Sequence, residues 1–465
     1  MHIPKIIILT LLICFGFASL PSARTWYVEK DGSGDYTIIQ QAVDAASPGD
    51  TIRIGTGRFT ENAPLTVGWT EDVYIAIQTD NLTLIGAGPD VTIIGPDEPE
   101  YVPPEMPKGI VGYYISYVEI SNLTVENVRD GIYRSDGGLT LLSIIIRGCD
   151  LGLISLTEGG MQIEGCSFLD NSGIGLMTYI PARDVEVKDS YFANNGTGLS
   201  FNQTENAYVY NCQLQNCIVG IQIHSYSNGG VFNCKFDNIQ NVAITIAIAS
   251  NAVVEGNVIT GGYRNIDITT LSHITGTGNI LSGGQIVTIR NSHSTHDFHG
   301  NHILNNGGYS VVLETFLNPP DVILDLSENY WGTMDTDTIE EWIRDGHDDP
   351  DIHAFVDFEP ISDFILDVDT PEAYHTDILK VIPNPFNPQT ELAYTLAQDG
   401  LIRLTIYDLL GRKITVLVDE HRLAGPGSVT WDGRDKNGSA VASGVYIARL
   451  ETKSGVNTQK LVLAR

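Results

Sequence analysis

The chain has 465 residues and a formal net charge of -31 at pH 7, because 57 Asp and Glu outnumber 26 Lys and Arg. Such a charge is repelled by nucleic acid and by anionic membrane surfaces, so we expect neither as a partner. The length allows two or three domains, each with its own core.

Residues 1–23 have the pattern of a secretory signal peptide. Lys5 supplies a positive charge, residues 6–20 are largely apolar, and Ala23 offers a small residue for cleavage. The apolar stretch is short for a transmembrane helix, and no later stretch is longer. We therefore predict an exported chain without a membrane-spanning segment after signal removal.

A short amphipathic helix is predicted directly after the first strand, Trp26–Val28. Thr37–Gln40 has the form of a capping box, and residues 38–46 place their apolar side chains on one helical face. A repetitive fold must cover its exposed end, and this helix is suited to that role.

From about residue 118 to residue 331 one short sequence motif recurs. A small or amide residue before an Ile or Leu marks each copy, and these markers are 21 to 23 residues apart: Gly131, Gly152, Gly175, Gly198, Gly220, Ala243 and Asn265. A fixed period of this length indicates a solenoid, whose units bury their apolar faces by stacking.

The content of each period predicts which solenoid it is. Apolar and polar residues alternate over three to five positions, as in Val185–Lys188, and Gly, Asn, Asp and Ser fill the connections. Three short strands and three turns per period make one coil of a parallel β-helix. Coils about 4.8 Å apart bring equivalent residues into columns. Asn257, Asn279 and Asn301 should therefore form a buried amide ladder, and Cys212 should stack on Cys234 as a buried thiol.

Several phrases resemble known families. Asp35–Gln40 and the coil period are similar to the right-handed, pectate-lyase-like β-helix superfamily, which implies this fold over residues 24–362. The end of this region, with a helix near Thr338–Ile343 and a strand at Ala354–Phe358, is similar to the tail that closes bacterial β-helices.

After a linker at residues 363–376, residues 377–465 form the last predicted domain. Regularly spaced short strands predict an immunoglobulin-like β-sandwich. Asn384–Pro388, Trp431–Gly433 and Ser443–Tyr446 resemble the type IX secretion sorting domain and the related domain of flagellar hook-capping proteins. This resemblance implies contact with a secretion machinery and delivery to the medium or outer surface of a Gram-negative bacterium.

Catalytic phrases of the pectinases are missing from the sequence, including the Asp-Phe-Ile-Phe-Gly phrase of pectin methylesterases and the Trp-Ile-Asp-His phrase of pectate lyases. The strongest catalytic candidates are Arg264 and Asp267, with Arg290 expected one coil beyond Asp267. A polysaccharide lyase needs such a cation and a base, although an exposed ion pair on a turn is the simpler interpretation.

Two clusters suggest metals, and no other cofactor is predicted. His293, His296 and His299, with His273 expected on the preceding coil, are ligands for Cu²⁺ or Zn²⁺ if they converge. Strand alternation opposes this convergence, and a solvated polar turn is the alternative. The second cluster, an end-cap loop in the simpler interpretation, has the oxygen ligands that Ca²⁺ prefers and consists of Asp345, Asp348, Asp349 and Asp351, with His347 and His353.

Three hypotheses for function follow. The first is a surface β-helix that binds a glycan or another partner. The second is a lyase or hydrolase of an acidic polysaccharide, and the third is a metal-binding β-helix. Converging carboxylates with Arg or Lys would favour an enzyme, whereas aromatic side chains along a groove would favour a binder.

Overall fold

The structure is a computed structural model, and it divides into two compact units at Asp363/Phe364. It describes residues 23–66, 70–99, 106–156, 158–179, 181–290, 295–305, 307–314, 322–363, 378–382, 386, 388–396, 400–408, 412–422, 425–436, 438–452 and 455–463. Neither helix in these ranges is long and apolar enough to cross a membrane.

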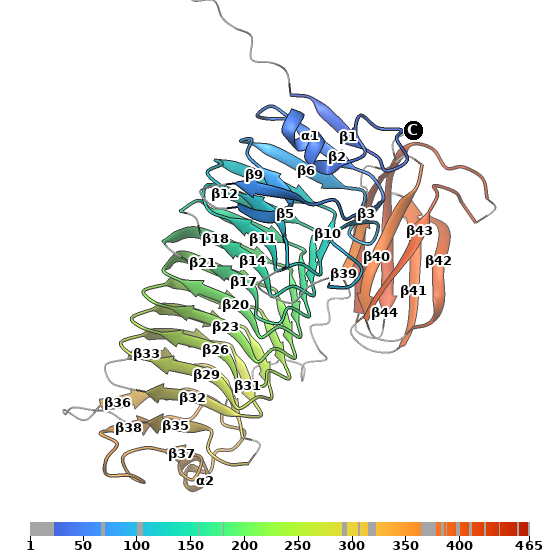
Figure 1. The fold of residues 1–465 in the computed structure, drawn as a ribbon. Coiled ribbons are helices and arrows are strands. Elements are labelled where there is room, and N and C mark those ends of the chain that lie inside the picture. The colour runs from blue at the N-terminus through green and yellow to red at the C-terminus, as the bar shows by residue number, and fades with distance from the viewer. Residues whose placement is uncertain are drawn as a thin grey trace, which may run out of the picture. The chain divides into compact units, whose positions relative to one another are not determined.

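The first unit is a parallel β-solenoid, which confirms the predicted fold (Figure 1). Three sheets run along it, and each regular coil gives one strand to each sheet. Sheet 1 contains β1(Thr25–Val28), β2(Thr51–Ile54), β6(Leu82–Gly86), β9(Tyr117–Ser121), β12(Gly138–Leu142), β15(Met161–Glu164), β18(Ala182–Lys188), β21(Thr204–Tyr210), β24(Asn228–Phe232), β27(Asn251–Glu255), β30(His273–Thr277) and β33(Thr295–Phe298).

Sheet 2 has the shortest strands, which are β3(Gly57–Phe59), β7(Thr92–Ile94), β10(Thr124–Glu126), β13(Ile145–Arg147), β16(Ser167–Leu169), β19(Tyr191–Ala193), β22(Gln213–Gln215), β25(Lys235–Asp237), β28(Val258–Thr260), β31(Ile280–Ser282) and β34(His302–Leu304). Sheet 3 contains β4(Ala63–Thr66), β5(Thr70–Ile77), β8(Lys108–Gly112), β11(Asp130–Arg134), β14(Leu151–Ser155), β17(Ile174–Thr178), β20(Thr197–Asn202), β23(Val219–His224), β26(Val242–Ala247), β29(Arg264–Thr269), β32(Gln285–Arg290), β35(Val311–Glu314) and β37(Ile343–Arg344). The turns between sheets are called here the 1–2, 2–3 and 3–1 turns.

The core is a stack of columns, because the period brings like residues above one another. Phe168 and Phe192 lie on adjacent coils with ring centroids 4.8 Å apart and planes 1° from parallel. Both are fully buried, as are Leu176 and Leu199 in the next sheet. Stacking of this kind buries each coil's apolar face against its neighbours and explains why the coils form only as a set.

Buried polar side chains join the coils at the turns. In the 1–2 turns, Asn257 donates to Asn279 Oδ1 at 3.0 Å, and Asn279 donates to Asn301 Oδ1 at 2.8 Å. The predicted ladder is confirmed, and Asn329 extends it by one coil through a 3.1 Å bond. The predicted stacking of buried thiols is confirmed too, since the Cys212 amide donates to Cys234 Sγ at 3.4 Å.

Helix α1(Ile39–Ala45) lies over the N-terminal end of the solenoid, as predicted (Figure 1). The predicted capping box is wrong, because the N-cap is Ile38 and no side chain caps the helix. Gln40 instead bonds the backbone of Ala76 on β5 in both directions, accepting from its N–H at 2.7 Å and donating to its carbonyl at 3.1 Å. The side chain that was expected to cap the helix therefore holds it on the first coils.

At the far end, α2(Thr336–Glu340) and the parallel pair β36(Val322–Asp325) and β38(Ala354–Asp357) close the solenoid. Trp331 is fully buried beneath them, with its ring 6.2 Å from that of Phe358.

The second unit is a small antiparallel β-sandwich, as predicted. Its two sheets contain β39(Ile378–Ile382), β40(Thr390–Leu396) and β43(Gly425–Trp431), and β42(Lys413–Arg422), β41(Gly400–Asp408), β44(Gly444–Thr452) and β45(Gly455–Leu463). Its separate core is built around Trp431, with the rings of Phe386 and Tyr446 at 5.5 Å and 5.2 Å.

Candidate functional site

The predicted pair Arg264 and Asp267 is largely buried and forms an ion triad on sheet 3 with the partly exposed Glu314. Arg264 on β29 donates to Asp267 Oδ2 at 3.1 Å and to Glu314 Oε1 on β35 at 3.0 Å. The arginine and aspartate side chains are less than a tenth exposed. Glu314 was not predicted as a member.

The electrostatics of the triad differ from those of an exposed turn. Burial raises the pKa of Asp267, although the adjacent Arg264 opposes the shift. Its Oδ1 atom has no hydrogen-bond partner among the described residues. A raised pKa beside a cation is one mark of an acid–base group.

The prediction that Arg290 lies directly one coil beyond Asp267 is wrong. Asp267 pairs with Thr288, whereas Arg290 pairs with Thr269 on one side and with Glu314 on the other. This step between coils is 21 residues instead of 23, because the turns differ in length. Nothing is described of the Arg290 side chain.

The predicted histidine cluster does not have the expected register. His273 pairs with Thr295, while His296 pairs with the buried Ile274. A shift of one residue exchanges the two faces of a strand. The expected stacking of His273 on His296 is therefore wrong, and His293 lies outside the described residues.

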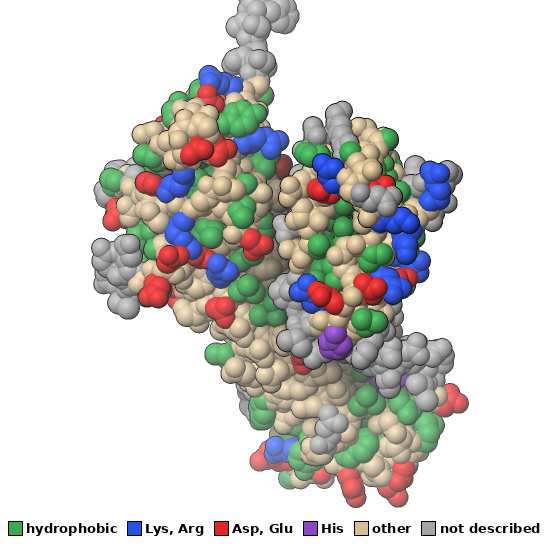
Figure 2. Space-filling view, turned by 90° about the vertical axis from the view of Figure 1, so that its right-hand side faces the viewer, with side chains coloured by type: hydrophobic (Ala, Val, Ile, Leu, Met, Phe, Trp, Pro, Cys, Tyr) green, Lys and Arg blue, Asp and Glu red, His purple; other side chains and the backbone are tan. Residues whose placement is uncertain are grey.

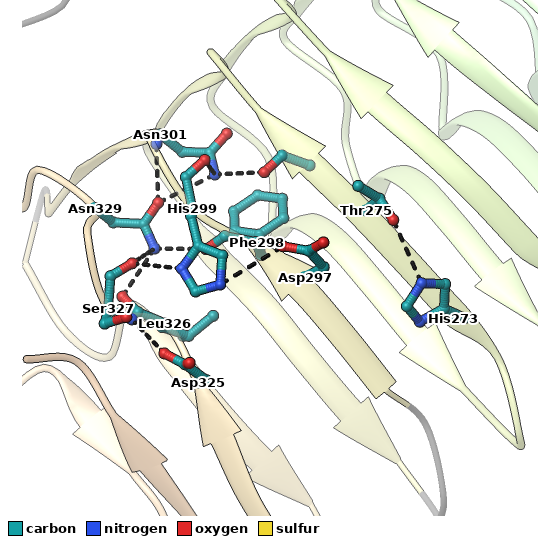
Figure 3. Close-up of polar contacts among 11 residues, drawn as sticks. His273, Thr275, Asp297, Phe298, His299, Asn301, Asp325, Leu326, Ser327 and Asn329 are labelled. Carbon is teal, nitrogen blue, oxygen red and sulfur yellow. Dashed lines mark hydrogen bonds and ion pairs between the residues drawn. The ribbon is translucent and has the colours of Figure 1, made fainter.

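The two histidines whose side chains are described have separate partners. Figure 3 shows His273 at the start of β30 and His299 just beyond the end of β33. His273 contacts Thr275 Oγ1 at 3.3 Å, and His299 Nδ1 lies 2.7 Å from the Ser327 carbonyl oxygen. Asp297 lies 3.6 Å from the other nitrogen of His299.

The acidic end-cap loop uses its carboxylates as turn acceptors. Figure 2 shows the acidic side chains gathered at the lower end of the solenoid. Asp345 accepts from the amides of His347 and Val356 at 2.8 Å and 2.9 Å. Asp349 pairs with Arg344 at 3.3 Å. Within the ranges that the structure describes, no three His, Cys, Asp or Glu residues form a group suited to hold a metal ion.

A second charged network, not predicted from the sequence, lies on sheet 3 near its first coils. Lys108 Nζ is 2.8 Å from Glu71 Oε2 and 3.6 Å from Asp130 Oδ2. Tyr113 donates to Glu71 Oε1 at 2.7 Å, and Lys108 lies 3.9 Å from the centre of the Tyr133 ring. The lysine and both carboxylates are nearly buried.

Contacts within this network shift the pKa values of Glu71 and Tyr113. Burial alone would raise the pKa of Glu71, but the hydrogen bonds from Lys108 and Tyr113 and the charges of Lys108 and Arg129 lower it. Burial and the bond to Glu71 raise the pKa of Tyr113. Glu71 stands on β5, before the regular period begins, so no spacing in the sequence pointed to Lys108.

The 3–1 edge of the solenoid carries a groove of about 290 Å³ that was also missed. Its lining comes from three successive coils and consists of Pro181, Ala182, Arg183, Gln203, Glu205, Tyr226 and Asn228. Tyr226 is 74% exposed. Arg183 and Glu205 lie 3.4 Å apart, so the charges in the groove are paired.

The backbone at this edge is strained. Tyr226 has a φ of 67°, and in the next two coils Ile248 and Leu271 have φ values of 57° and 59°. Bulky and β-branched residues rarely adopt this left-handed conformation, which costs about 1–3 kcal/mol each. Ile248 and Leu271 are 45% and 56% exposed, so an apolar strip continues from Tyr226.

A sequence signal for this strip exists. Ser227, Ser250 and Ser272 recur 23 and 22 residues apart, and the hydroxyls of Ser250 and Ser272 each accept from the serine amide one coil before. Aligning on these serines places Tyr226 and Leu271 at one station, but it does not reveal the positive φ.

The 2–3 edge has a second depression, of about 410 Å³. Its lining is uncharged and consists of Asn171, Ser172, Asn194, Asn195, Gly196, Asn216, Ile218, Asn238 and Gln240. Each regular strand of sheet 3 runs from a 2–3 turn to a 3–1 turn. The outer face of sheet 3 therefore lies between this depression and the groove of Tyr226.

Family comparisons agree with the two units. Residues 108–231 match the right-handed β-helix region, and residues 380–464 match the secretion system C-terminal sorting domain. The chain is a right-handed parallel β-helix protein with a C-terminal sorting domain. It is a substrate of type IX secretion, delivered to the cell surface or medium of a Gram-negative bacterium of the Bacteroidetes type.

A comparison with curated proteins gives no match. Among solved structures, the chain is similar to latent PorU of Porphyromonas gingivalis at 23% identity, covering 18% of this chain and 9% of that one, with a TM-score of 0.17. PorZ of the same organism, a component of its type IX secretion system, matches at 24% identity over 21% of this chain and 13% of its own, with a TM-score of 0.17. The A-module of the Azotobacter vinelandii mannuronan C-5 epimerase AlgE6 matches at 14% identity over 70% and 92% of the two chains, with a TM-score of 0.49. The chain thus spans only a small part of the first two proteins.

Proposed function

We propose that this exported β-helix protein binds a glycan along the 3–1 edge, with Tyr226 as the stacking platform. The observation that carries the proposal is the groove in which this exposed tyrosine stands beside Arg183, Gln203 and Asn228. An aromatic ring offers an apolar face to the C–H groups of a sugar. The amides and the guanidinium offer hydrogen bonds to hydroxyl groups.

The strain at this edge supports the same proposal. Tyr226 is placed outward by a left-handed backbone that stability alone does not favour. The exposed Ile248 and Leu271 extend the apolar surface along the direction of the coils. A long ligand lying parallel to the solenoid axis would contact Tyr226 and Leu271, which occupy equivalent positions two coils apart, and would pass beside Ile248.

The test is a binding titration with soluble polysaccharides, comparing the wild type with Tyr226→Asn. Asparagine tolerates positive φ, so this variant removes the ring without adding strain. We expect binding about three- to tenfold weaker, since aromatic contacts contribute about 0.5–1.5 kcal/mol. Tyr226→Phe should keep the affinity, and Tyr27→Asn, at an exposed tyrosine on β1 outside the linings of both depressions, is the control. Equal affinity of the wild type and Tyr226→Asn would contradict the proposal.

A second candidate function is cleavage of a polysaccharide, favoured by the Arg264–Asp267–Glu314 triad. Asp267 is the candidate base or acid, because burial raises its pKa and one of its oxygens has no partner in the described residues. Asp267→Asn keeps the shape and removes the proton transfer, which contributes about 100-fold or more to such reactions. Release of reducing ends or unsaturated products by the wild type, lost in this variant, would establish the activity. Absence of products from the wild type would reject it.

A further inference from the structure

We infer that the glycan is uncharged and is also bound at the 2–3 edge, by a ladder of surface asparagines. The inference rests on the proposed glycan binding and deepens it by naming the class of ligand. The ladder is made of Asn194, Asn216 and Asn238, which lie on three successive coils in the depression of about 410 Å³.

Hydrogen bonds fix the amides in one orientation. Asn238 donates to Asn216 Oδ1 at 2.8 Å, and Asn216 donates to Asn194 Oδ1 at 3.2 Å. Asn194 in turn donates to Asp170 Oδ1 at 2.8 Å. All four residues have φ values between 51° and 57°, which directs the chain outward at this turn.

The ladder leaves bonding capacity unused. A side-chain amide has two N–H donors and an oxygen with two lone pairs. The bonds within the ladder take one donor and one lone pair of Asn216. One donor and one acceptor remain at each coil, repeated about every 4.8 Å. A hydroxyl group both donates and accepts, so a polyhydroxylated chain matches this array.

The charges around the depression favour a neutral polysaccharide over an acidic one. The lining of the depression contains no Lys, Arg or His among the described residues. The nearest charges are carboxylates, since Ser172 donates to Asp150 at 3.0 Å and Asn194 donates to Asp170. The chain carries a net charge of -31. An anionic polymer would meet repulsion without a compensating cation, whereas a neutral sugar would not.

Ile218 supplies the apolar contact that the amides lack. It is 49% exposed and lies in the same lining. The depression therefore combines an apolar spot with fixed amides, as the groove of Tyr226 combines a ring with amides.

The experiment uses the full chain without its signal peptide. It measures binding of two neutral polysaccharides, a soluble β-glucan and dextran, and of two acidic ones, alginate and polygalacturonate. The test variant is Asn216→Asp, which keeps the size and the tolerance of positive φ but replaces the two donors with a charge. The control is Asn233→Asp, an exposed asparagine with a φ of 53° on a 1–2 turn.

We expect a neutral polysaccharide to bind, with Asn216→Asp about tenfold weaker and Asn233→Asp unchanged, a difference of about 1.4 kcal/mol. Preference for an acidic polysaccharide, or equal binding by both Asp variants, would overturn the inference. In that case a loss of binding in Tyr226→Asn would still support the proposed function. If none of the four polysaccharides binds the wild type, both the inference and the proposed function fail.

Discussion

At the residue scale, one buried amide joins three coils. Asn279 Oδ1 accepts from the backbone and side-chain nitrogens of Asn257, and its Nδ2 donates to the Val254 carbonyl and to Asn301. Asn279 is fully buried, away from bulk solvent. Its neighbours have no alternative partner in solvent if the amide is removed.

Asn279→Leu should therefore destabilise the solenoid, since each stranded buried group costs about 1–3 kcal/mol. The midpoint of chemical denaturation measures the loss. Asn251→Leu, at an exposed position on β27, is the control and should leave the midpoint nearly unchanged. An equal midpoint in the wild type and Asn279→Leu would show that the ladder contributes nothing to stability.

The Glu71 network predicts a pH dependence. The pKa of Glu71 is lowered below its ordinary value of 4.5, so its contribution to stability is present above that pH and is lost as the pH falls below it. Glu71→Gln should lower the free energy of unfolding by about 3 kcal/mol at pH 7, because it leaves Lys108 buried with a weaker partner. The difference from the wild type should shrink below pH 4.5.

Denaturation curves at pH 7 and pH 3.5 would check this prediction. Asp72→Asn changes an exposed carboxylate on the same strand and should show no such narrowing. A difference that is constant with pH would mean that the pKa of Glu71 is the same in the folded and the unfolded protein, which would contradict the lowering of that pKa by the network.

At the element scale, the sequence predicts the coils but not their registers. The spacing of 22 between Asn257, Asn279 and Asn301 predicts a ladder correctly, because a buried amide column has to repeat with the local period. The same reasoning fails for His273, where an assumed step of 23 replaces the actual step of 22. One residue is enough to reverse a face, and turn lengths decide it.

Helix α1 illustrates a second limit of sequence reasoning. The phrase Thr37–Gln40 satisfies a local capping pattern, but Gln40 bonds Ala76 instead, 36 residues away. Tertiary contacts thus override a local motif when a side chain can reach an unpaired backbone group.

Gln40→Met should loosen this attachment, because the thioether side chain has no N–H to donate to the Ala76 carbonyl and is at best a weak acceptor for the Ala76 N–H. Hydrogen exchange at the Ala76 amide should become faster, while exchange within sheet 2 stays unchanged. Gln41→Met makes the same substitution at an exposed position of the helix and is the control. Faster exchange in both variants would point to helix fraying and not to the lost contact.

At the scale of the whole molecule, the solenoid and the C-terminal sandwich have separate hydrophobic cores. The solenoid core runs from Val28 to Phe358, and the sandwich core surrounds Trp431. The period and the C-terminal phrases together predict both folds from the sequence. The candidate grooves could not be predicted, because they depend on backbone angles such as that of Tyr226 and on contacts between irregular coils such as Glu71 with Lys108.

The separate cores predict that export and folding can be uncoupled. Removing Pro383–Arg465 deletes most of the sandwich and leaves the residues of the solenoid core intact. In its host, the truncated protein should fold and cross the inner membrane by the predicted signal peptide, residues 1–23, yet remain in the periplasm. Cell fractionation with protease treatment of intact cells would locate it.

As the reciprocal control, residues 364–465 fused to a periplasmic reporter should carry that reporter to the surface. Normal surface delivery of the truncated chain would show that the C-terminal unit is not the export signal, and an unfolded truncated chain would show that the solenoid depends on it.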